Sequence, residues 1–576
     1  MKKDFQKRLL PFGVGMSVFG LAALSVMHYL WGDLLLMEYH TDITDTLMWA
    51  DAIYKSGRLV SPDHYYPYVI PFGGQLLMLP FIPFFGAGIT TLRLGMTVFF
   101  VLFSLLLVVF FDRVAFRALP ASLTASGCMI LIFMYNKKLR EVMYAHVIHY
   151  SLAIVLILLL CIVLALLLDE KHGAKKRTAL YIALGVSGFF CAANGLTVLA
   201  LSLCPVGMAF LLERAVNTLG FRHAWDSRQE DIRACGVVIA SALCGLAVYG
   251  LLSYGAHAEY GKQYMHLVGP EMWIDNIRST VEQWIQILLR PELFGDTVPA
   301  VSSMTRYGSY MHFGLKLCMT AALPLMLVLT VMRYGRLKSR TQRIVVLVFW
   351  MLALITFVLY AVTKLNFSSW RMIPMLFMMF AALAVLIGNM LEDDRLSLRR
   401  AGAVLAAGMI FIAVHAGAGV LTAYADKDVW FEEGSALDTI LDHGLTHGFT
   451  NTQTLVKTYG MLTGGEVDMS YIQVRSRPGK YHARLYQNDA ADFLPQEDPD
   501  ARYFVLITDL QNVHEPVGYT EKYEGVTFLP SYFSWRDTYT DYVIYVFDHY
   551  PLETTMYEDF SYKMIELEDV IKRKGD

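Results

Sequence analysis

The chain has 576 residues, of which 55% are hydrophobic and only 17% are charged, and its mean hydropathy is +0.43. Soluble proteins carry about 25% charged residues, so this composition excludes an ordinary soluble domain and indicates a membrane protein. The formal net charge of -3 gives no reason to expect nucleic acid or another polyanion as a partner. All seven cysteines lie in or beside apolar runs, which argues against a disulfide framework.

Membrane spans are expected wherever about 18 or more mostly apolar residues occur together, and about 11 stretches come near that criterion. The first, at 10–31, follows a basic start but is longer than the apolar region of a signal peptide, so we interpret it as a retained span. The other expected spans are 91–111, 119–135, 150–168, 178–193, 196–213, 233–253, 313–332, 344–362, 373–391 and 401–423.

The distribution of lysine and arginine predicts which loops face the cytoplasm. Clusters within 2–8, 113–117, 171–177, 214–233, 333–343 and 395–400 all fall on one side of the expected spans. This pattern predicts a multi-pass protein of the plasma membrane with a cytoplasmic N-terminus and an outer C-terminus. The second outer loop departs from the pattern because it carries Lys137, Lys138 and Arg140, which raises the question of what anion these bases meet.

Two long outer loops, 37–90 and 253–312, separate the expected spans, and a polar tail follows them. The sequence therefore predicts a transmembrane domain over 1–424 and an extracytoplasmic α/β domain over 425–576. In the tail, strands are expected at 446–451, 467–475, 501–509 and 542–548, with helices at 452–463 and 567–574.

The loop 253–312 contains a predicted amphipathic helix. Trp273, Ile277, Val281, Trp284 and Leu288 recur every three to four residues, which places them on one helix face. Such a helix either lies in the headgroup layer or packs on the bundle, and the sequence does not choose between these arrangements.

Asp42 and Asp45 are the first candidates for chemistry. They lie three residues apart at the start of a predicted helix, where they would share one face. One interpretation is that either aspartate caps the helix. The other is that an ionised carboxylate here acts as a general base toward an acceptor hydroxyl.

Glu141, His146 and His149 form a second candidate group in the loop 136–150. A carboxylate and two imidazoles suit a divalent cation such as Mn²⁺ or Mg²⁺, whereas histidines near a membrane interface more often hydrogen-bond their neighbours.

Arg371 opens an expected span on the outer side, where it would either reach lipid phosphate or clamp a substrate phosphate. Lys137, Lys138 and Arg140 are further candidates for holding that phosphate. Nucleotide-binding and common hydrolase motifs are missing from the sequence, so an outer site needs a donor already present in the membrane.

The layout of the first 170 residues resembles the GT-C membrane glycosyltransferases of the protein O-mannosyltransferase and aminoarabinose transferase type. The residues that carry the resemblance are Asp42 or Asp45, Ala50, Ser56-Gly57, Tyr66-Pro67, Phe85-Gly86 and Arg93-Leu94. Many relatives have an Asp-Glu pair, whereas Ile43 follows Asp42 here, which leaves the equivalent aspartate open. Counting back from Ser56-Gly57 favours Asp42.

The resemblance implies an inverting hexosyl- or related transferase of the cell envelope, with a polyprenyl-phosphate-linked sugar as donor and a glycan, lipid or protein as acceptor. It implies that the first-loop acid is the base and that basic groups hold the lipid phosphate, with Tyr66 and Arg93 among the substrate-binding candidates. Two other classes share the topology: a lipid-linked glycan transporter or flippase, and a non-catalytic assembly protein. A transporter predicts ionisable residues or broken helices near mid-membrane, and Asp33 and Lys316 are the candidates for such ionisable residues.

Overall fold

The computed structural model describes most of the chain. The described residues are 2–39, 41–169, 172–219, 228–258, 266–288, 303–364, 368–423, 430–432, 435–452, 455–474, 481–484, 488, 490–498, 500–507, 526–535, 538–558 and 563–566.

Nine helical segments in this part of the chain are long and apolar enough to cross a membrane, or ten when one bent pair is counted as a span. They include seven single helices: α1 (Lys2–Trp31), α9 (His149–Asp169), α13 (Arg228–Leu252), α15 (Ser303–Arg333), α16 (Arg340–Val362), α17 (Ile373–Leu391) and α18 (Leu396–Leu421). Two more are composite: α6 (Ile89–Phe110) with η2 (Phe111–Phe116), and α11 (Leu196–Leu201) with α12 (Leu203–Leu219). The protein is therefore a multi-pass membrane protein.

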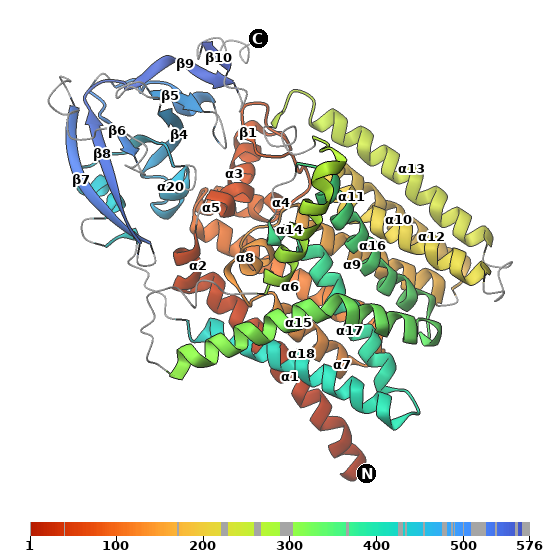
Figure 1. Cartoon of the computed structure of the whole chain (residues 1–576). Helices are drawn as coiled ribbons and strands as arrows, with labels where there is room; N and C mark the ends of the chain where they lie inside the picture. The colour runs from red at the N-terminus through yellow and green to blue at the C-terminus, as the bar shows by residue number, and fades with distance from the viewer. Residues whose placement is uncertain are drawn as a thin grey trace.

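The bent pair lies at the expected third span. Helix α7 (Leu119–Ile132) is followed by α8 (Lys137–Arg140) and η3 (Glu141–Ala145), at an angle of 120° to it. The segment at 178–193 does form a helix, α10 (Ala174–Ala193), but this helix is not among the segments that are long and apolar enough to cross a membrane. It packs along α13, as Figure 1 shows, so the expected count of about 11 differs from the observed nine or ten at this helix and at the bend.

The long loop 37–90 folds into short elements rather than an extended connection. They are α2 (Asp33–Glu38), α3 (Thr41–Ser56), β1 (Tyr65–Tyr66), α4 (Gln75–Met78), η1 (Leu79–Phe81) and α5 (Ile82–Phe85). Strand β1 pairs in parallel with β2 (His257–Ala258), so the two long outer loops meet.

The loop 253–312 contains η4 (Pro270–Met272) and α14 (Trp273–Gln286). Trp284 and Leu288 are buried, and the Asn276 side chain donates a hydrogen bond to the Ala361 carbonyl at 3.1 Å. Trp273, Ile277 and Val281 are exposed. One side of the helix therefore packs on α16, and most of the predicted apolar face lies at the surface.

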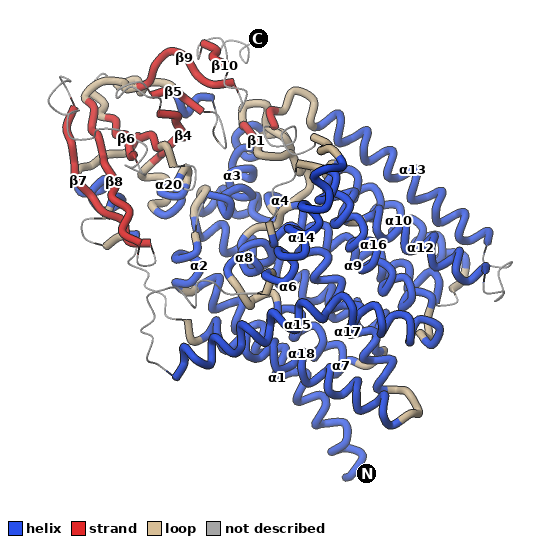
Figure 2. The backbone as a smooth tube through the Cα atoms, viewed as in Figure 1, coloured by secondary structure: helices blue, strands red, loops and turns tan. Residues whose placement is uncertain are grey.

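The tail forms a mixed eight-stranded sheet with the order β10-β9-β5-β4-β3-β6-β8-β7. Figure 2 shows these strands gathered on one side of the helical region, at the end opposite the N-terminus. The bounds are β3 (His447–Thr450), β4 (Asp468–Val474), β5 (Tyr481–Arg484), β6 (Tyr503–Ile507), β7 (Val526–Trp535), β8 (Thr538–Phe547), β9 (Leu552–Glu558) and β10 (Lys563–Glu566).

Both faces of the central strands are buried. Along β6, Tyr503, Val505 and Ile507 belong to one apolar cluster, and Phe504 and Leu506 belong to another that includes residues of α19 (Ala436–Asp442) and α20 (Thr458–Leu462). This alternation follows from the two-residue period of a strand.

The four expected strands are present as β3, β4, β6 and β8, and four further strands complete the sheet. The expected helix at 452–463 is shorter, because only Thr458–Leu462 is helical as α20. The expected helix at 567–574 lies outside the described residues.

Candidate functional site

The two first-loop aspartates lie in the first turns of α3 but differ in exposure. The side chain of Asp42 is 50% exposed, whereas Asp45 is only 4% exposed. An acid in the first turn is favoured by the positive end of the helix dipole. Of the two carboxylates, Asp42 is therefore the one that a substrate can reach.

The second outer loop packs directly against the start of α3. The Nδ1 atom of His146 lies 2.6 Å from the carbonyl oxygen of Asp42. Gly74, in the first loop, donates its N–H to the Val147 carbonyl at 3.1 Å, and a Cβ atom at Gly74 would lie 2.7 Å from the Val147 side chain. This close approach requires glycine and fixes the second loop beside Asp42.

Lys138 brings a positive charge to this aspartate. Its ammonium donates to Glu141 Oε1 at 2.7 Å and lies 3.9 Å from Asp42 Oδ2. The same ammonium lies 5.0 Å from the centre of the Trp370 ring, next to Arg371 in η7 (Ser369–Met372). Lys138 thus joins the first-loop acid to the start of the α17 span.

A second chain of contacts runs from Asp45 to Arg371. The Tyr68 hydroxyl donates to Asp45 Oδ2 at 3.4 Å, and the Tyr68 ring meets His149 edge to face at 4.9 Å. His149 in turn lies 3.9 Å from the Tyr150 ring, and Tyr150 hydrogen-bonds Arg371. The acids of the first loop and Arg371 therefore belong to one continuous polar and aromatic cluster.

Glu38 and Arg140 form a buried ion pair. Arg140 Nε donates to Glu38 Oε2 at 3.1 Å, a second guanidinium nitrogen contacts the other carboxylate oxygen, and both side chains are buried. Arg140 Nη1 also donates to the Met134 carbonyl at 2.9 Å. The anions that the bases of the second loop meet therefore include carboxylates of the protein itself.

Burial sets the protonation of two groups near the aspartates. The pKa of the Tyr68 hydroxyl is raised well above its usual value, first by burial and then by the negative charge of Asp45, so Tyr68 remains a donor. Burial lowers the pKa of His146, although Glu141 and Asp42 act in the opposite direction. A neutral His146 donates from Nδ1 to the Asp42 carbonyl.

The expected metal group is not assembled. Within the described residues, no three His, Cys, Asp or Glu side chains lie together as a metal site, so Glu141, His146 and His149 do not form one. Glu141 contacts Lys138, His146 contacts the Asp42 carbonyl, and His149 lies between Tyr68 and Tyr150. The three side chains therefore interact with different neighbours and do not converge on one point.

The remaining predicted site residues make contacts of their own. Tyr66 is buried, and its hydroxyl accepts the Ser61 N–H at 2.9 Å. Arg93 donates to the Gly32 carbonyl at 3.2 Å, which ties α6 to the junction of α1 and α2. Lys137 is half-buried at the start of α8.

Sequence reasoning missed three contributors: Glu38, Tyr68 and Tyr150. A signal existed for Glu38, because an acid directly after the first span is a natural partner for the unexplained bases of the second loop. Nothing in the local sequence distinguishes Tyr68 or Tyr150 from the other tyrosines.

The two residues considered for a transport pathway lie at different positions along their helices. Asp33 is the first residue of α2, just beyond α1. Lys316 is exposed near the middle of α15.

No protein-family model matches the sequence, and no curated protein sequence is similar to it. Solved structures do match. ArnT from Cupriavidus metallidurans in the apo state has a TM-score of 0.50 at 12% identity, with 92% of this chain and 97% of that chain covered. ArnT bound to undecaprenyl phosphate gives 0.48 at 11% identity, with 93% and 97% covered.

An oligosaccharyltransferase from Archaeoglobus fulgidus gives a TM-score of 0.45 at 11% identity, with 92% of this chain and 74% of that chain covered. At this level of identity, the match to apo ArnT shows the fold alone. It confirms the expected GT-C-like fold: a polytopic helical membrane protein with a C-terminal sheet region.

Proposed function

We propose that this protein is a glycosyltransferase that moves a sugar from a polyprenyl-phosphate-linked donor to an acceptor at the outer face of the membrane. One observation carries the proposal: Asp42, half exposed, lies in the same cluster as Lys138 and Arg371, where spanning helices meet the folded outer loops. ArnT, whose fold the chain shares, has been solved with undecaprenyl phosphate bound, and we extend that ligand class to this chain as part of the proposal.

The chemistry requires a base and a cationic site on opposite sides of the sugar. Asp42 removes the proton of the acceptor group, whose heteroatom attacks the anomeric carbon. The bond from that carbon to the phosphate oxygen breaks, the configuration inverts, and polyprenyl phosphate leaves with the bonding electrons. Arg371 stabilises the negative charge that grows on the leaving group, whereas Lys138, 3.9 Å from Asp42 Oδ2, lies on the side of the base.

The other members of the cluster act as positioning residues. Tyr68 holds the buried Asp45 carboxylate, and His146 holds the backbone of Asp42. Within the described residues no three His, Cys, Asp or Glu side chains form a metal site, so each step is assigned to protein side chains.

The proposal is tested by replacing the base without changing the size of its side chain. Asp42→Asn should lower transfer from a panel of polyprenyl-phosphate-linked hexoses and pentoses by about 10²- to 10⁴-fold, the range expected for loss of a general base. The purified variant should still be stabilised by polyprenyl phosphate. The matched control is Asp51→Asn, the same substitution further along α3, where the carboxylate pairs with the exposed Lys55.

Arg371→Ala separates binding of the donor from chemistry. It should weaken the stabilisation by polyprenyl phosphate, whereas Asp42→Asn leaves it intact. If Asp42→Asn and Asp45→Asn each retain near wild-type transfer, the first loop does not contain the catalytic base. Mass spectrometry of surface glycans and glycoproteins from cells with and without the gene would identify the sugar and the acceptor.

A further inference from the structure

A second polar cluster lies at the end of the bundle opposite the candidate site. Helix α17 begins beside Arg371 and ends at Leu391, so its 19 residues separate the two places by about 28 Å. The ends of α15 and α17 and the starts of α16 and α18 surround a depression of about 370 Å³ there. Its lining residues are Arg333, Arg336, Lys338, Asn389, Glu392, Asp393, Asp394 and Arg395.

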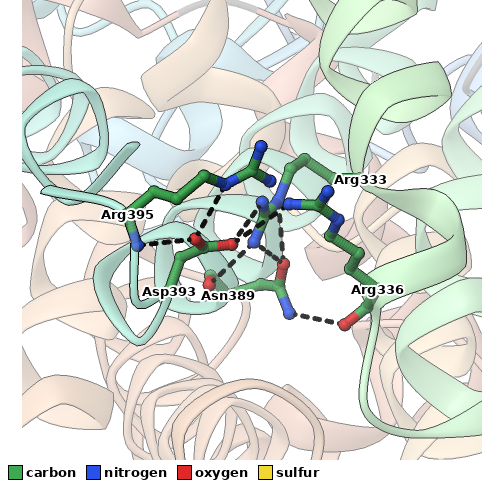
Figure 3. A network of polar contacts seen from close by, with 5 residues as sticks. All are labelled: Arg333, Arg336, Asn389, Asp393 and Arg395. Carbon is green, nitrogen blue, oxygen red and sulfur yellow. Dashed lines mark hydrogen bonds and ion pairs between the residues drawn. The ribbon is translucent and has the colours of Figure 1, made fainter. Parts of the chain in front are cut away.

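The centre of the depression is an arginine with a structural role. Arg333 is buried, and its guanidinium donates to Asn389 Oδ1 at 2.6 and 3.0 Å and to the Asn389 carbonyl at 3.1 Å. A further nitrogen donates to Asp393 Oδ2 at 2.7 Å. Figure 3 shows this guanidinium held between the two residues. Arg333 therefore joins α15 to the end of α17.

Asp393 is shared by three arginines. Besides Arg333, it contacts Arg336 Nη1 at 3.5 Å and Arg395 Nε at 3.3 Å (Figure 3). The Arg336 and Arg395 side chains are 50% and 54% exposed. An arginine side chain has five N–H donors, and within the described part of the chain each of these two side chains contacts Asp393 through one nitrogen. Both therefore retain donors for another oxyanion.

The charges of the lining residues do not cancel. The four cations are Arg333, Arg336, Lys338 and Arg395, against the three carboxylates of Glu392, Asp393 and Asp394, which leaves one net positive charge. Lys338 and Glu392 form an ion pair in which both side chains are exposed. Such pairs contribute little to stability, so Lys338 can readily bind another anion. An anion of higher local charge can therefore compete for these cations.

The surroundings point to the membrane as the source of that anion. The spanning segments that include α15, α17 and α18 reach their ends here. On α15, Val328, Val331 and Met332 are exposed within two turns of Arg333. In a spanning helix these side chains face acyl chains, so the depression lies at the depth of the adjoining lipid headgroups. Basic pockets between helix ends at this depth suit phosphate headgroups.

We propose that this depression binds the phosphate of an anionic phospholipid, with Arg336, Arg395 and Lys338 as donors. Arg333 keeps Asp393 and the helix ends in place and is not itself a ligand. A guanidinium can bind two oxygens of a phosphate at once. In a zwitterionic lipid, the ammonium group of the headgroup offsets the negative charge of the phosphate, so the attraction to the arginines is weaker. The proposal requires only that these helices span a membrane, so it is independent of the transferase activity.

The test uses the full-length protein in detergent with defined lipids. Native mass spectrometry should show retention of phosphatidylglycerol over phosphatidylcholine with the same acyl chains. Each positive charge at a membrane surface contributes about 1 kcal/mol, which is about fivefold in affinity. The double variant Arg336→Gln/Arg395→Gln should therefore bind phosphatidylglycerol about 25-fold more weakly.

Two further variants make the charge argument specific. Lys175→Gln/Lys176→Gln removes two exposed charges from the start of α10, outside the depression, and should leave retention of phosphatidylglycerol unaltered. The neighbouring Arg177, which pairs with Glu230 at the start of α13, is kept. Asp394→Asn removes an acid that lines the depression and should strengthen binding by about fivefold. All variants are first required to elute as monodisperse protein with wild-type thermal stability.

Three outcomes would overturn the proposal. The first is equal retention of the two lipids by wild type, and the second is unchanged retention by the double arginine variant. The third is complete displacement of phosphatidylglycerol by low-millimolar inorganic phosphate, because that result would identify a site for free anions rather than for a lipid headgroup.

Discussion

The buried pair of Glu38 and Arg140 should control the stability of the outer loops. Both side chains lie away from solvent, and two guanidinium nitrogens of Arg140 contact the Glu38 carboxylate. Arg140→Met leaves a buried carboxylate without its cation, and Glu38→Gln leaves a buried guanidinium without its anion. Breaking a buried pair from one side costs about 3–5 kcal/mol, whereas replacing both partners by neutral groups is often close to neutral. Each single variant should therefore be much less stable than the double variant.

A double-mutant cycle measures this coupling. The free energy of unfolding in mixed micelles, followed by tryptophan fluorescence, is compared for wild type, the two single variants and Glu38→Gln/Arg140→Met. We expect the free energy of unfolding of the double variant to be at least about 2 kcal/mol higher than the sum of the two single losses would give. Strictly additive losses would refute it, because they would mean that the two charges do not depend on each other.

Three further predictions concern positioning and protonation. Tyr68→Phe removes the hydroxyl that contacts Asp45, so we expect a loss of about 1 kcal/mol in stability and less than tenfold in transfer rate, both measured on purified protein. Burial lowers the pKa of His146 in the folded protein, whereas in the unfolded chain the pKa is about 6.5. As the pH falls below about 6.5, the unfolded chain therefore takes up a proton that the folded protein does not, and the folded protein loses stability. Between pH 7.5 and 5, the unfolding temperature should therefore fall less for His146→Gln than for wild type. An equal fall in the two proteins would contradict the lowered pKa of His146. Lys457→Met removes the cation that lies 2.9 Å from Asp468 in the tail, so it should raise the protease sensitivity of the tail, and unchanged cleavage would show that the pair is not structural.

The spans could be predicted from the sequence because hydropathy is a local property. Every expected span coincides with a helix, and the deviations in the count come from α10, which is too polar for the criterion, and from the bend after Ile132. The bend has a physical cause that the sequence shows only weakly: Asn136 caps α8 by accepting the Leu139 N–H at 2.9 Å, which starts a new helix direction.

The site could be predicted only in part, because its contacts join distant segments. The patterns around Asp42 and Arg371 singled out loops that the structure brings together, but Glu38 and Arg140 lie 102 residues apart and no periodicity connects them. The amphipathic helix shows a similar limit. Its spacing correctly predicted a helical face, yet Trp284 is buried and Trp273 is exposed, because packing against α16 covers only part of that face.

The contacts between the tail and the first outer loop have a consequence for biogenesis. The Trp430 indole donates to the Leu36 carbonyl at 2.7 Å, and the Tyr39 hydroxyl lies 3.0 Å from Met461 Sδ, with sequence separations of 394 and 422 residues. Tyr65 donates its N–H to the Asn488 carbonyl at 3.1 Å, so the tail touches the first loop at three places. The segment that contains Asp42 is therefore synthesised about 400 residues before the segments that support it. Truncated reporter fusions, the usual means of mapping topology, would present this loop without its supports, so sidedness is better measured by inserting small tags into the complete chain.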